Sequence, residues 1–78
     1  MQSLAHNYLL AGEPVKALHV VEILLESDPA DRVALEMRQQ ALNVLLDAAE
    51  NGLGNDYEIY WLKARMADTA ARLETPGP

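Results

Sequence analysis

The chain has 78 residues, half of them hydrophobic, and a formal charge of −6 at pH 7. This length makes one small domain, and the absence of cysteine excludes disulfides, thiolate nucleophiles and thiolate zinc sites. The excess of acidic residues argues against nucleic acid and anionic lipid as partners, because both attract basic patches.

The first predicted helix covers residues 3–11, where Leu4 and Tyr8 stand one turn apart. Gly12 suits the left-handed residue that ends a helix, since it has no side chain to clash there. Pro14 suits the first turn of a helix, where its missing N–H costs nothing. These residues predict a tight turn between two helices.

The second predicted helix covers residues 14–27, and its polar residues form one narrow stripe. A helix that is apolar around most of its circumference is typical of a buried element with several neighbours. We therefore expect this helix to be central. Four apolar residues, two on this helix and two on the next, are predicted to form the core: Val20, Leu24, Val44 and Leu45.

The third predicted helix covers residues 31–50 and follows the sequence "SDPAD". Asp28 is predicted to cap it, because an aspartate side chain can accept from the free N–H groups of a first turn. Pro29 would then stand in that first turn. The glycine-containing segment 51–54 ends the helix and is predicted to be a flexible joint.

The fourth predicted helix covers residues 57–73. Asn55 and Glu58 precede and open it at the spacing of a capping box. Asp68 and Arg72 lie four residues apart and are expected to pair on its surface. Residues 1–74 are thus predicted to form a single helical domain, with residues 75–78 as a tail.

The first two helices resemble a tetratricopeptide repeat over residues 1–31. The repeat would recur after about 34 residues, but Gln39, Leu46 and Asn51 stand where its characteristic residues should return. The resemblance implies one tetratricopeptide-like hairpin, and the helical pattern of the remaining residues adds two further antiparallel helices, so the chain is predicted to be an all-α, four-helix fold. The residues that carry it are Tyr8, Gly12, Ala17, Leu25, Asp28 and Pro29.

A second resemblance covers nearly the whole chain. The sequences "AGEPVKAL", "DPAD" and "NDYEIYWLKARM" are similar to the helical domain that follows the catalytic domain in alkyl-sulfatase-like hydrolases of the metallo-β-lactamase superfamily. The resemblance implies a domain that mediates dimerisation, while the zinc chemistry belongs to a hydrolase domain linked upstream. This chain lacks that domain's histidine-rich metal motif.

No set of residues predicts catalysis within the chain. His6 and His19 fall on different predicted helices, and the sequence has no HxH or HExxH motif. Glu22 and Glu26 lie one turn apart, which is more typical of a solvated stripe than of an acid–base pair. We expect no enzymatic activity, no metal and no cofactor. No apolar run approaches the ~20 residues that span a bilayer, and no signal peptide opens the chain, so we expect a cytoplasmic protein.

Three of the four aromatic residues crowd the start of the last helix: Tyr57, Tyr60 and Trp61. Such rings either close a helical core with their polar atoms at its rim or act as exposed anchors of an interface. Together with Leu62 they form the predicted interface. The prediction is a symmetric homodimer, and the alternative is a small tetratricopeptide-like adaptor that binds a peptide or protein partner.

Overall fold

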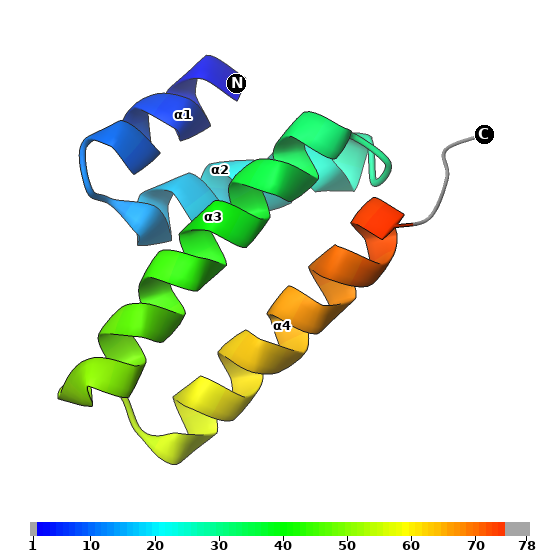
Figure 1. Ribbon diagram of the computed structural model, residues 1–78. Helices are drawn as coiled ribbons and strands as arrows, with labels where there is room; N and C mark the ends of the chain where they lie inside the picture. Colours follow the sequence, from blue (N-terminus) through cyan, green and yellow to red (C-terminus); the bar gives the residue numbers. More distant parts are fainter. Residues whose placement is uncertain (1, 75–78) are drawn as a thin grey trace.

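The computed structural model describes residues 2–74, without the side chain of Leu53, as four helices joined by short turns (Figure 1). The described part contains no strand, so the all-α prediction is confirmed. The predicted tail, residues 75–78, lies outside the described residues. The helices are α1 (Gln2–Leu10), α2 (Pro14–Ser27), α3 (Arg32–Ala48) and α4 (Asp56–Glu74).

Helix α3 is the central element, and the prediction that the second helix is central is wrong. Helix α3 contacts α1, α2 and α4, whereas the backbone of α2 contacts only those of α1 and α3. Figure 1 shows α1 and α2 over the first part of α3, and α4 antiparallel to α3 along its length. The apolar composition of α2 suggested a central helix, but part of its apolar surface is exposed to solvent: Val15 is 65% exposed and Ile23 is 40% exposed.

Two clusters of buried residues hold the helices together. The larger joins α1, α2 and the first part of α3, with Leu73 of α4 packed against it. The smaller joins the last part of α3, the turn after it and α4, with Leu18 of α2 packed against it. Of the predicted core residues, Val20 is buried and Leu24 and Leu45 are partly buried, but Val44 is 50% exposed and does not belong to the core. The buried members are Ala5, Val20, Val21, Leu25, Ala34, Leu35 and Met37 in the first cluster and Leu42, Ala49 and Leu62 in the second.

The turn between α1 and α2 has the predicted geometry. Gly12 has φ +75°, and its N–H donates to the carbonyl of Leu9 at 3.2 Å, while the N–H of Glu13 donates to that of Tyr8 at 2.9 Å. These two bonds make a Schellman motif, which satisfies carbonyls left free at a helix end. Pro14 is the first residue of α2, as the sequence predicts.

The cap of α3 is Asp31, and the prediction of Asp28 is wrong. The Asp31 carboxylate accepts from the backbone N–H groups of Val33 and Ala34 at 3.0 and 3.2 Å. Asp28 accepts instead from the N–H of Ala30 at 3.2 Å. Its side chain closes the turn two residues on, a bond typical of aspartate in turns, and so does not reach the helix.

The connection between α3 and α4 is tightly packed. Helix α3 ends at Ala48, two residues before its predicted end, and the chain continues through a wider turn, Ala49–Leu53, in which Gly52 has φ +97°. A Cβ on Gly54 would lie 2.7 Å from that of Ala49. The Asn55 side chain then accepts from the N–H of Glu58 at 2.9 Å, which is one arm of the predicted capping box. That this connection opens as a joint stays a prediction.

Candidate interface on the distal hairpin

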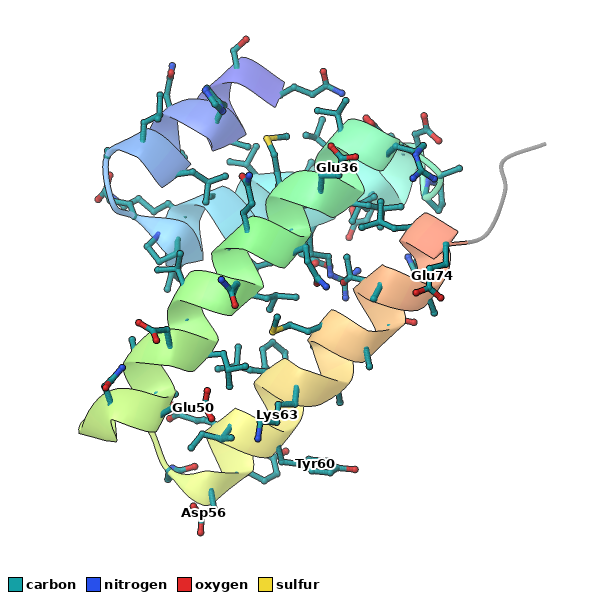
Figure 2. All side chains as sticks on the ribbon, viewed as in Figure 1. Glu36, Glu50, Asp56, Tyr60, Lys63 and Glu74 are labelled. Atoms are coloured by element: carbon teal, nitrogen blue, oxygen red, sulfur yellow. The ribbon has the colours of Figure 1, made fainter. Side chains whose placement is uncertain are left out.

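The distal hairpin is the last part of α3, residues 42–48, together with the first part of α4, residues 56–66. It carries all four predicted interface residues, which differ sharply in burial. Tyr57 is 76% exposed, Tyr60 73% and Trp61 40%, whereas Leu62 is 6% exposed. Figure 2 shows Tyr60 pointing away from α3. The rings of Tyr57 and Tyr60 therefore do not close the core of this chain.

Leu62 is an internal residue of the distal hairpin. It packs in the second core cluster, with Ile59 and Met66 against the same cluster. Positions 59, 62 and 66 follow helical spacing, so the face of α4 that meets α3 includes Leu62. A side chain this buried offers almost no surface to a partner. The exposed part of the predicted interface therefore consists of the three rings alone.

Trp61 lies at the boundary between core and solvent. The guanidinium carbon of Arg65, one turn further along α4, lies 4.9 Å from the centroid of the indole. A cation over an aromatic face at this distance contributes about 0.5–1 kcal/mol at an exposed site. Trp61 also lines two cavities.

The first cavity, here called the distal groove, has a volume of about 330 Å³ and is mainly apolar. It opens where α3 has α4 on one flank and no second helix on the other, because α2 covers only the first part of α3 (Figure 1). Val44, which lies one turn before Ala48 on α3, is half exposed for the same reason. The groove is lined by Leu45, Ala48, Ala49, Glu58, Trp61 and Leu62.

The second cavity, here called the junction cavity, has a volume of about 130 Å³ and lies where α2, α3 and α4 meet. Helices α2 and α4 flank α3 without contacting each other's backbone. Side chains therefore bridge the space between them. The cavity is lined by Leu18, Glu22, Arg38, Leu42, Trp61 and Arg65.

Arg38 is the residue of this region that sequence analysis missed. Its side chain is 3% exposed, its Nε lies 3.2 Å from the Glu22 carboxylate, and a terminal nitrogen lies 3.8 Å from the Asp68 carboxylate. Arg72 approaches the same Asp68 oxygen at 3.3 Å, as the predicted pair requires. Arg38 lies four residues after Ala34 and therefore on the same, inner face of the helix. A charged residue on that face was the signal in the sequence that could have identified it.

The buried guanidinium is incompletely satisfied. Its Nε makes no hydrogen bond, because the Glu22 oxygen does not lie in line with the N–H. Charge-assisted bonds are normally about 2.7–2.9 Å long, so both carboxylates stand further away than a full bond requires. An ionised group that is buried without complete pairing costs free energy. Arg38 is thus a buried cation that its two neighbouring carboxylates compensate only in part.

The other candidate sites do not come together. His6 and His19 are exposed on α1 and α2, and residues 2–74 hold no group of three histidine or acidic side chains arranged for a metal ion. Glu22 faces Arg38, while Glu26 is exposed. Within the same residues, none of the helices combines the length and the apolar character needed to cross a bilayer.

Comparison of the chain with protein-family models, with curated proteins and with solved structures gave no match. The two resemblances noted in the sequence therefore depend on the motifs that carry them.

Proposed function

We propose that this chain is a non-catalytic assembly domain that pairs with a second copy of itself through the distal hairpin. One observation carries the proposal: three exposed aromatic rings and an open apolar groove occur on the same pair of helices. Tryptophan and tyrosine are the residues that most often dominate the energy of an interface. The groove, which Trp61 lines, offers a place where rings of a partner can be buried.

The charge of the chain favours α4 as the pairing surface. Residues 57–78 contain three acids and three bases, whereas residues 1–56 contain nine acids and three bases. Two copies that approach through their acidic parts repel each other, and that repulsion is smallest where the charge balances. The exposed aromatic residues lie within this neutral segment.

The second core cluster is small, so a partner that buries apolar surface beside it would stabilise the distal hairpin. Apolar surface removed from water contributes roughly 25 cal/mol per Å², and small domains often gain the burial they lack by oligomerising. Trp61, which lines the distal groove, is 40% exposed, and Val44, one helical turn before the lining residue Ala48, is 50% exposed. A second copy that covers them would complete the side of α3 that α2 leaves open.

We further propose that the domain is the C-terminal accessory part of a metallo-β-lactamase-superfamily hydrolase of the alkyl-sulfatase-like kind. The support is the similarity of "AGEPVKAL", "DPAD" and "NDYEIYWLKARM" to that family. The reading frame upstream of this chain should then encode a histidine-rich metal motif. A frame without such a motif contradicts the parentage and leaves the pairing proposal intact.

Light scattering across a dilution series tests the pairing. We expect twice the monomer mass of 8.6 kDa at high concentration, and Trp61→Ala should weaken the dimer by about 2 kcal/mol or more, roughly thirtyfold. The matched control is Val15→Ala, which trims an apolar side chain that is 65% exposed on α2 and should leave the dimer unchanged. A mass of 8.6 kDa at every concentration overturns the proposal.

A rival function is favoured by the same groove. An adaptor could bind an amphipathic helix of a foreign protein there, since such helices lay an apolar face into grooves of this type. The acidic surface of the chain makes a basic or neutral peptide the better match. A monomer in light scattering that retains an exposed Trp61 would favour this alternative.

A further inference from the structure

We propose that two copies of the chain pair with their α4 helices antiparallel, each copy laying its exposed rings over small residues of the other. This orientation depends on the pairing through the distal hairpin proposed above, and it specifies which residues of the two copies meet. The outer face of α4, which is turned away from α3, carries it. The pattern of that face is complementary to itself only when one of the two helices is reversed.

The outer face of α4 is an exposed seam, with rings in its first part and alanines after them. Tyr60 points away from α3 (Figure 2), while Leu62 on the opposite face is buried in the second core cluster. The members of the seam are spaced alternately three and four residues apart, and all are exposed: Tyr57, Tyr60, Ala64 and Ala67. Residues at this spacing form the line along which one helix packs against another.

Reversal of the second copy sets large residues against small ones. Tyr60 and Ala64 stand two residues before and after Leu62. Tyr57 and Ala67 stand five residues before and after the same centre. One antiparallel register, centred at Leu62, therefore places both rings of each copy over alanines of the other. A parallel pair would oppose ring to ring and alanine to alanine, which leaves gaps beside the alanines and loses their packing contacts.

Two unpaired charges of α4 favour the same register. Glu58 and Arg65 are seven residues apart and therefore lie on one side of the helix. Neither side chain forms an ion pair with another of the described residues. Glu58 stands three residues before Trp61, and Arg65 stands three residues after Leu62, so reversal about this centre brings the acid of each copy alongside the base of the other. A parallel pair would set like charges side by side, and such flanking charges decide the orientation of helix pairs.

Trp61 stands one residue before the centre of this register. It is 40% exposed and lines the distal groove. The indoles of the two copies therefore approach each other, and each lies at the mouth of the other copy's groove. The register thus covers the three exposed rings of both chains at once.

The chain has no cysteine, so introduced thiols report the orientation without interference. Tyr57→Cys and Ala67→Cys are mixed in equal amounts and oxidised, and intact mass identifies the linked chains. In the antiparallel register, position 57 of one copy faces position 67 of the other. Two thiols at the same position then lie about 15 Å apart along the helix axis, beyond the reach of a disulfide. We expect mixed linkages at least about fivefold in excess of like ones. Ala11→Cys, exposed at the end of α1, is the control and should give no linked chains.

Charge reversal gives an independent measurement. Glu58→Arg sets arginines side by side in the antiparallel pair and should weaken the dimer at least about threefold. Addition of Arg65→Glu should restore the affinity, because each acid again meets a base. Glu26→Arg is the matched control, since it makes the same change of net charge at an exposed position of α2. Light scattering across a dilution series compares the variants.

The outcomes separate the orientation from the pairing itself. An excess of like linkages overturns the orientation and leaves the pairing intact. So does the absence of any linkage in a chain that is dimeric by light scattering, or a double variant that pairs no better than Glu58→Arg alone. A mass of 8.6 kDa at every concentration overturns both.

Discussion

The two ends of α3 show what a helix gains from a second neighbour. The proximal region, which is α1, α2 and the first part of α3, surrounds that part of α3 on two sides and buries the larger core cluster. In the distal hairpin α3 packs mainly against α4, with Leu18 of α2 at the edge of the cluster, and among the described residues Tyr57, Tyr60 and Trp61 stay exposed. Residues 41–48 of α3 hold six hydrophobic residues of eight, against four of nine in residues 32–40, yet fewer of them are buried. The number of covering helices, and not the sequence of α3, decides how much is buried.

Arg38 lies where the two regions meet. Its guanidinium contacts Glu22 of α2 and Asp68 of α4, two helices whose backbones do not contact each other. An apolar side chain at this position would fill the space without linking the flanking helices. The arginine instead joins the proximal region to α4 through charge, at the cost of burying an ion that is incompletely bonded.

The largest predicted changes in the free energy of unfolding come from substitutions in the two core clusters. Leu35→Ala, in the first cluster at 2% exposure, should lower the free energy of unfolding by about 3–5 kcal/mol. Leu62→Ala, in the second cluster, should cost about 2–3 kcal/mol, because the open groove beside it lets the structure relax. Urea unfolding at the lowest usable protein concentration measures both with little contribution from self-association. An equal loss in the two variants would show that the regions form one core.

The two turns provide a second test. Gly54→Ala should cost about 2–3 kcal/mol, because the added Cβ would lie 2.7 Å from the Cβ and 3.1 Å from the Cα of Ala49. Gly12→Ala meets no atom within 4 Å, so only its left-handed backbone is strained, and we expect a cost of about 1 kcal/mol. Thermal unfolding of both variants measures the difference. If Gly12→Ala is the more damaging, the distal turn is looser than its contacts indicate.

Local signals in the sequence predicted the helices well. Gly12 and Pro14 each have one strong backbone preference, and both occupy the positions that those preferences imply. The pairing of Asp68 with Arg72 also follows from spacing within one helix. Residues whose structure depends on near neighbours can be read from the chain.

Features that depend on distant helices could not be read in this way. The apolar circumference of α2 predicted a central helix, yet centrality depends on where α4 packs. Val44 has the spacing of a core residue and lies half exposed because no helix covers that side of α3. The exposure of Tyr57 and Tyr60 was one of two open alternatives, and only the position of α4 against α3 decides between them for a single copy.

The caps of α3 and α4 give smaller predicted effects than the two cores. Asp31 accepts two backbone N–H bonds and one bond from the side-chain amide of Gln2 at 2.9 Å, so Asp31→Ala should cost about 1–2 kcal/mol. Asn55→Ala removes one bond at the start of α4 and should cost about 0.5–1 kcal/mol. Asp28→Ala is the control, because it removes only the bond to Ala30. Urea unfolding ranks the three. If Asp28→Ala lowers the free energy of unfolding more than Asp31→Ala does, then Asp28 caps α3 in solution. The spacing of Asp28 from α3 would then matter more than the bond between Asp31 and Gln2 of α1.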